Sequence, residues 1–474
     1  MSSTTIERPL VGDEPPSPAS TRGRARPGLR GRLVSLPLLA LVSFLVLVPV
    51  GFILLAAWVD EVPRPGNISL SPTLDNFRVL VADGVLKAAG NSILIAVGST
   101  VLALLIGGFL AFVTARTNIP GKPLVFLIGL MPLFLPSYVG ALAWSILGSP
   151  GAGLINIAFR DMGITGPVID AYSLVGVVAV MAMYYAPYAF LMIHSSMKMM
   201  NPDLEDAAGV HGGTSWRTIR SITIPLSLVA ILGAGLLIFV LVFENFPVSQ
   251  VLATPGGIDT LPTFIYKLMN STPSRGNQAA VVAIVLVAVV LVAVVLIVTA
   301  VQRRFLAKRS FTTVSGKGVK PRQVSLGRWR WPAVAAAIVY FTLSIVLPLG
   351  ALLLSAIRTS PYMRSFTSLT EPGAIDLSSF VAAVNSSGFT TSTVNSVVVS
   401  LLAATAGTAL AFATRAFHRR AHELPARHAG AEDGHDLPKM EDGLVHGVSP
   451  CRSRSWAPTW RRPRPKPSAT AMTT

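Results

Sequence analysis

The chain has 474 residues and a formal net charge of +17, yet only 13% of its residues are charged and 51% are hydrophobic. Soluble globular domains carry about 25% charged residues, so this composition excludes an ordinary soluble protein. The single cysteine, Cys451, also excludes an intrachain disulfide framework and a cysteine-rich metal site.

The amino-terminal segment, residues 1–32, is rich in Pro, Ser and Arg and is predicted to be a disordered cytoplasmic tail. The apolar run that follows is too long for the hydrophobic core of a cleaved signal peptide. We therefore expect it to be a retained membrane anchor.

Runs of about 20 apolar residues recur along the chain, and each is long enough to cross the hydrocarbon core of a bilayer. The predicted fold is an all-α, polytopic membrane helix bundle of about eight transmembrane helices. The predicted spans are 35–58, 92–114, 124–148, 172–195, 226–247, 280–301, 332–356 and 395–414.

Basic residues are distributed unevenly between the two sides of the membrane that these spans imply. The four segments assigned to the inside, up to residue 330, hold 20 Lys and Arg, and the four outside loops hold 8. This asymmetry predicts a cytoplasmic amino terminus and places the loop 200–225 and the basic linker 303–330 in the cytoplasm. It also accounts for the net charge without a nucleic-acid partner.

The cytoplasmic loop 200–225 carries a spaced pattern, E-A-A-x3-G-x9-I-x-L-P. Its acidic place is taken by Asp206, which follows Glu205. The other matching positions are Ala207, Ala208, Gly212, Ile222, Ile224 and Pro225. Acidic residues favour a helix start, Gly212 permits a left-handed turn, and proline is tolerated in a first helical turn.

This loop resembles the coupling loop of permease subunits in ATP-binding-cassette (ABC) importers, where a short helix docks on the ATP-hydrolysing subunit. An ordinary amphipathic loop helix is the alternative. The resemblance implies the type I ABC importer permease fold, a separate ABC ATPase subunit and an extracytoplasmic solute-binding protein. It also implies a bacterial inner (plasma) membrane location.

The chain contains a long-period repeat. Pro49-Val50-Gly51 recurs as Pro348-Leu349-Gly350, Asn91-Ser92 as Asn395-Ser396, and 110–114 as 410–414. Parallel repeats occur in transport proteins. The pattern resembles the fused permeases of the ferric-iron, thiamine and polyamine type, in which two six-span halves share one polypeptide.

By this resemblance, residues 33–302 form a first six-span half and 331–415 form two spans of a second half, so that half is expected to be truncated. Residues 416–474 are expected to be a polar, disordered or non-native tail, whose histidines lack a regular ligand spacing. Activity would then require a partner permease half or a homodimer.

No segment fits G-x4-G-K-[ST], so ATP hydrolysis is expected on another subunit, and neither a catalytic residue, a cofactor nor a metal site is predicted. Glu244, Asn245 and Tyr185 are the candidate pathway residues, because ionisable and polar groups near spans are often functional. A carboxylate reaching the outer interface, and an aromatic belt for the tyrosines, are the alternatives.

The predicted function is therefore a permease subunit that passes a solute from a binding protein to the cytoplasm. Ferric iron is the favoured substrate, ahead of thiamine, polyamine or phosphonate. An ion-gradient-driven secondary transporter and a non-functional permease remnant are the two alternatives.

Overall fold

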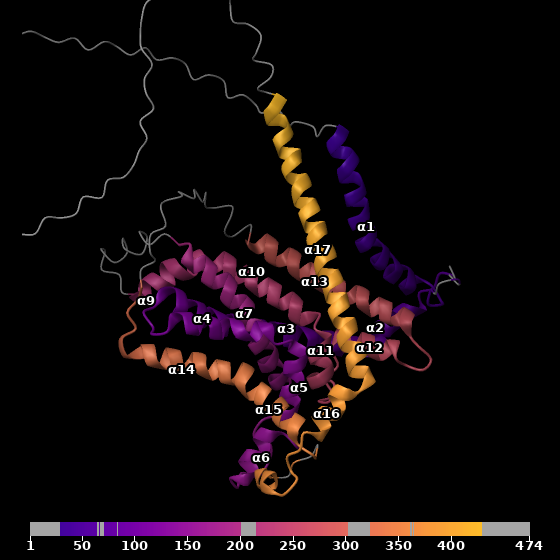
Figure 1. The fold of residues 1–474 in the computed structure, drawn as a ribbon. Helices are drawn as coiled ribbons and strands as arrows, with labels where there is room; N and C mark the ends of the chain where they lie inside the picture. The colour runs from indigo at the N-terminus through magenta and orange to yellow at the C-terminus, as the bar shows by residue number, and fades with distance from the viewer. Residues whose placement is uncertain are drawn as a thin grey trace, which may run out of the picture. The chain divides into compact units, whose positions relative to one another are not determined.

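A computed structural model describes residues 29–63, 66, 71–82, 84–200, 215–301, 323–360, 363 and 365–428. The chain divides into two units, Leu36–Ala409 and a smaller unit of Met1–Ser35 with Leu410–Thr474. Most of the described helices lie in the larger unit, Leu36–Ala409 (Figure 1). Within the described ranges, the secondary-structure elements are helices, and β-pairing is limited to isolated bridges.

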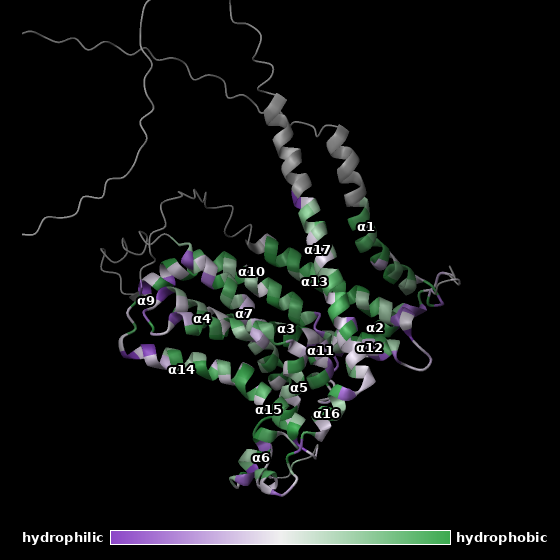
Figure 2. Ribbon diagram, viewed as in Figure 1, coloured by the Kyte–Doolittle hydropathy of each residue, from purple (hydrophilic) through white to green (hydrophobic). Residues whose placement is uncertain are grey.

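Seven of these helical stretches are long and apolar enough to cross a membrane, and a bent pair makes up to eight. They are α1 (Leu29–Trp58), α3 (Val85–Arg116), α7 (Leu174–Lys198), η3–α10 (Ile219–Thr223 and Ile224–Phe243), α13 (Gly276–Val301), α14–η7–α15 (Arg330–Phe341, Thr342–Val346, Leu347–Ile357) and α17 (Ser387–His428). The predicted all-α membrane bundle is confirmed. Figure 2 shows how the hydrophobic residues follow these helices.

Shorter helices connect the spans. They are η1 (Asp75–Arg78), α2 (Val79–Ala82), α6 (Leu154–Asp161), α9 (Ser215–Thr218), α11 (Phe246–Val248), η4 (Ser249–Ala253), α12 (Leu261–Met269), η6 (Gly327–Trp329), η8 (Phe366–Thr370) and α16 (Ser378–Asn385). Helix α17 continues through residues 416–428, so the beginning of the expected disordered tail is helical. Residues 429–474 lie outside the described part.

The third predicted span is not one kinked helix. Helix α4 (Lys122–Leu130), continued by η2 (Met131–Phe134), meets α5 (Ser137–Gly148) at an angle of 93°. Leu135 precedes Pro136 and has an extended backbone, as sterics before a proline favour. Proline therefore divides the predicted span 124–148 into two helices.

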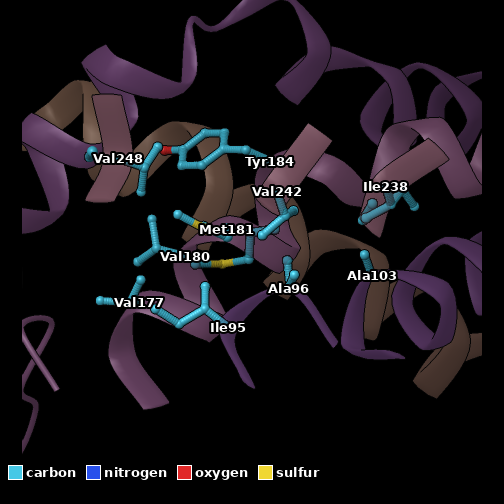
Figure 3. Close-up of a cluster of buried hydrophobic side chains, with 14 of the residues drawn as sticks. Ile95, Ala96, Ala103, Val177, Val180, Met181, Tyr184, Ile238, Val242 and Val248 are labelled. Atoms are coloured by element: carbon cyan, nitrogen blue, oxygen red, sulfur yellow. The ribbon is translucent and has the colours of Figure 1, made fainter. Parts of the chain in front are cut away.

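Helices α3, α7 and α10 form the centre of the bundle. One face of α3 carries small buried residues at helical spacing: Ser92, Ala96, Ser99, Ala103 and Gly107. A Cβ atom on Gly107 would lie 2.5 Å from the Ala186 carbonyl oxygen, so this glycine allows α3 and α7 to approach closely. Figure 3 shows part of the buried core, which includes Ile95, Val177, Val180, Met181, Ile238 and Val242.

Two helices widen into a π turn just before a proline. The segment η3 precedes Pro225, and η7 precedes Pro348. A proline inside a helix lacks an N–H and clashes with the carbonyl of the residue four places earlier. The wider turn relieves that clash while the helix continues, and the N–H of Ile224 and of Leu347 donates five residues back.

The seventh span, α14–α15, and its flanking segments contact earlier parts of the chain at three depths. At one end Val324 pairs with Thr117 as an isolated bridge, and its N–H donates to the Arg116 carbonyl over 2.7 Å. Midway, the Tyr340 hydroxyl donates to the Met183 carbonyl over 2.9 Å. At the other end the Phe366 N–H donates to the Asp161 carboxylate over 2.8 Å.

The Tyr340 contact has a cause in the sequence of α7. Pro187 stands four residues after Met183 and has no N–H, so the usual helical donor to the Met183 carbonyl is missing. Tyr340 supplies the missing donor from α14. This is where Pro187 frees a carbonyl, as its position inside an apolar span predicts.

Candidate substrate pathway and coupling region

The end of α10 holds two of the predicted pathway residues. Glu244 is the exposed residue that caps the carboxyl end of α10, and Asn245 is buried between α10 and α11. The Asn245 side-chain oxygen accepts from the Val248 N–H at 2.9 Å and thereby caps α11. Its backbone carbonyl accepts from the Ser249 hydroxyl at 2.8 Å.

Asn245 also reaches the third predicted pathway residue. Its Nδ2 atom donates to the Tyr185 hydroxyl over 2.7 Å, across 60 positions of sequence. The Tyr185 ring stacks near that of Tyr188, with centroids 6.0 Å apart. The structure thus brings Tyr185 and Asn245 together on facing elements, with Glu244 adjacent in sequence and exposed.

A second connection holds the segment after α11 against α3. The Ser92 hydroxyl accepts from the Leu261 N–H at 2.8 Å, and the Asn91 side chain donates to the Asp259 carbonyl over 3.0 Å. In the sequence, Asn91 and Ser92 are recognisable only as part of the repeat. Two polar residues at the start of an apolar span indicate a hydrogen-bonding role. Their partners, Asp259 and Leu261, lie 168 and 169 residues away, so the sequence does not identify them.

Beyond its first residue, loop 200–225 is described only on its carboxyl side. Ile222 lies in η3, and Pro225 lies in the first turn of α10, both partly buried. Glu205, Asp206, Ala207, Ala208 and Gly212 lie outside the described residues. The helix α9–η3–α10 therefore runs without interruption from residue 215 to Phe243, next to Glu244 and Asn245.

The carboxyl end of α7, which leads into this region, lies against the end of α3. Arg116 is 1% exposed, and its Nη2 atom lies 2.9 Å from the Met200 sulfur. In the part of the chain that the structure describes, no three His, Cys, Asp or Glu side chains are grouped so that they could hold a metal ion.

The part of the chain that holds these residues is similar to a known protein family. Residues 103–312 match the family model of the binding-protein-dependent transport system inner membrane component. This match includes α7, α10, the whole loop 200–225, Tyr185, Glu244 and Asn245.

Several permeases are similar over about half of the chain. Over 282 residues it is 23% identical to the maltodextrin transport system permease protein MalC of Streptococcus pneumoniae, covering 54% of this chain and 65% of that protein. It is 26% identical to a putative 2-aminoethylphosphonate transport system permease protein of Salmonella paratyphi A, covering 52% and 86%. It is 21% identical to a putative ferric transport system permease protein of Haemophilus influenzae, covering 51% and 37%.

The chain thus spans 65% of the length of the maltodextrin permease that it matches. Among solved structures, a bacterial ABC transporter involved in the import of alginate aligns with 20% identity and a TM-score of 0.48, covering 58% of this chain and 96% of that chain. Residues 103–312 are thus similar to the family of binding-protein-dependent transport system inner membrane components.

Proposed function

We propose that the chain is a permease subunit of an ABC-type importer in a bacterial inner membrane, with its amino terminus in the cytoplasm. It passes a solute from an extracytoplasmic binding protein to the cytoplasm, and a separate ATPase subunit supplies the energy. The observation that carries this proposal is the family match over 103–312, which contains the pattern from Asp206 to Pro225.

The ATPase contact in this proposal is loop 203–213. Helix α9–η3–α10 follows the loop directly and packs along α3 and α7, so a push on the loop would move the centre of the bundle. The same helix ends next to Glu244 and Asn245. A single helical element thereby connects the coupling loop to the candidate pathway.

Crosslinking tests the ATPase contact. A cysteine at Ala207 or Ala208 should capture the ATPase subunit, whereas one at Lys87, on the outer side in the proposed topology, should not. Replacing Gly212 by valine should leave ATP hydrolysis in place but uncouple it from transport, because a left-handed turn disfavours a β-branched residue. Failure of both cysteines to capture the ATPase would contradict the contact.

We further propose that Glu244, Asn245 and Tyr185 line the outer part of the solute pathway. A carboxylate and a phenol offer oxygen ligands, and ferric iron is the substrate we favour from the resemblance to the fused iron permeases. Transport systems for maltodextrin, 2-aminoethylphosphonate and ferric iron all appear among the relatives, so the three solutes should be assayed together.

Uptake into vesicles that hold the chain with its ATPase and binding protein tests this pathway. Glu244→Gln should lower iron uptake at least severalfold, while Glu371→Gln, an exposed carboxylate on the loop after α15, should not. Uptake should require ATP and persist when ion gradients are collapsed. Gradient-driven uptake would instead favour a secondary transporter.

A second permease half, from a partner chain or a homodimer, is the remaining element of the proposal. None of the residues in the apolar window of α17 is buried in the described structure. Asn395 and Ser396 on α17 are exposed, whereas Asn91 and Ser92, at the corresponding places of the repeat, hold Asp259 and Leu261. Uptake by a monomeric preparation, with no other permease present, would contradict this element.

A further inference from the structure

The start of the seventh span carries an exposed basic and aromatic cluster. Arg328, Trp329, Arg330 and Trp331 are consecutive and all exposed, with Trp329 at 68% and Trp331 at 60%. The Arg330 guanidinium carbon lies 5.6 Å from the centroid of the Trp331 ring. Tryptophan favours the interface between headgroups and acyl chains, where its polar and apolar parts are both satisfied.

An exposed stripe leads from this cluster into the membrane. Trp329, Pro332, Ala336, Val339 and Leu343 follow one another at intervals of three or four residues, and each is exposed. Such spacing places side chains along one face of a helix. Figure 2 shows the change from hydrophilic to hydrophobic residues along α14.

The stripe runs into an apolar groove of about 470 Å³ between α3, α7 and α14. Its lining includes Leu102, Leu105, Phe109, Val339, Tyr340 and Leu343. At a rise of about 1.5 Å per residue, the lining lies about 10–21 Å below Arg116 along α3 and about 9–20 Å below Arg330 along α14. Thr117 follows the end of α3, Val324 precedes the start of α14, and the two residues pair with each other. The depths measured along the two helices can therefore be compared directly.

We propose that this surface binds one anionic phospholipid, with its headgroup at Arg328 and Arg330 and an acyl chain in the groove between α3 and α14. The depth of the groove matches the acyl region of a single leaflet, since the hydrocarbon core is about 30 Å thick. Each guanidinium group is exposed, and a guanidinium is complementary to a phosphate because its planar set of donors matches two phosphate oxygens.

The sidedness of the site follows from the proposed topology, in which linker 303–330 is cytoplasmic. The linker adds Lys317, Lys320 and Arg322 just before the cluster in sequence. Basic segments next to a span on that side attract anionic lipids. The lipid site does not otherwise depend on which solute is transported.

Spin-labelled lipids test the proposal on the full chain in nanodiscs. Labelled phosphatidylglycerol should be retained by the protein more strongly than labelled phosphatidylcholine. Arg328→Gln and Arg330→Gln should each reduce that preference about fivefold, as expected for one basic residue near a membrane surface. Lys87→Gln removes an exposed charge near the opposite end of α3 and should leave the preference unchanged.

A second variant tests the groove separately from the charges. Val339→Trp should fill the groove and release both labelled lipids to the mobility of bulk lipid, and soluble glycerol phosphate should not compete with the lipid. Helix content and monodispersity report on folding of each variant. Equal retention of the two lipids by the unaltered chain would overturn the proposal, as would full retention by Val339→Trp. Loss of lipid only when a second copy associates would assign the groove to protein contact instead.

Discussion

At the scale of single residues, the close contact between α3 and α7 depends on an absent side chain. Gly107 faces the Ala186 carbonyl oxygen, the Ala189 Cβ atom and the Phe190 nitrogen, all within 2.7 Å of where its own Cβ would stand. Two of these three atoms belong to the backbone of α7, which cannot rotate away as a side chain can. Separation of the two helices is then the only relief.

We expect Gly107→Ala to destabilise the chain by about 1–3 kcal/mol, the usual effect of overpacking. Gly108→Ala is the matched control, because its nearest neighbour would be Ile193 Cδ1 at 3.7 Å. That change should be neutral or stabilising, since alanine favours a helix. Unfolding in graded detergent mixtures measures both, and equal stability of the two variants would contradict the close contact.

Pro187 and Tyr340 form a second pair whose effects should not be additive. Tyr340→Phe leaves the Met183 carbonyl without its donor and should destabilise the chain by about 1 kcal/mol, the scale of hydrogen bonds between membrane helices.

In a Pro187→Ala background, the alanine N–H can satisfy the same carbonyl within α7. Tyr340→Phe should then have less than half of its original effect. A double-mutant cycle on unfolding free energies measures the coupling. Strictly additive changes would mean that the proline is not the reason for the tyrosine.

At the scale of elements, the break after α10 depends on one asparagine. Asn245→Ala removes both the cap of α11 and the partner of the Tyr185 hydroxyl, and should lower stability by about 1–2 kcal/mol. Asn245→Asp should have a smaller effect, because its carboxylate can still accept from the Val248 N–H and from the tyrosine. The exposed Asn270→Ala at the end of α12 serves as the control, with little expected change.

Much of this architecture is predictable from the sequence, because apolar runs report directly on the hydrocarbon core. The second span differs only at its ends. The predicted span begins at residue 92, whereas α3 begins at Val85. The first turns of α3 precede the apolar run and include the exposed Lys87, so hydropathy does not detect them.

The remaining features depend on contacts across the fold. Pro136 signals a disruption, but nothing local to it specifies an angle of 93°. The partner of Asn245 is 60 residues away, and that of Tyr340 is 157 residues away. Hydropathy carries no information about such pairs, so their geometry emerges only from helix packing.

At the scale of the whole molecule, the charge asymmetry makes a prediction about sidedness. Residues 59–90 should lie outside, and the basic segment 302–330 should lie inside. In intact cells, an impermeant thiol reagent should label a cysteine at Ser69 and spare one at Ser315, provided that Cys451 is replaced first. Lysed cells supply the control, where both sites should react. Preferential labelling of Ser315 in intact cells would invert the topology.

The three contacts of the seventh span also bear on whether the two parts of the chain must be one polypeptide. Val324, Tyr340 and Phe366 each meet a partner in the first half through non-covalent contacts, so the peptide bonds of segment 302–322 are not what holds that span in place. Two genes, encoding residues 1–311 and 312–474, should therefore yield fragments that co-purify, and Tyr340→Phe together with Asp161→Ala should weaken their association. Fusion or fission of the coding sequence within segment 302–322 would then be close to neutral for folding, and this segment would be free to change in length.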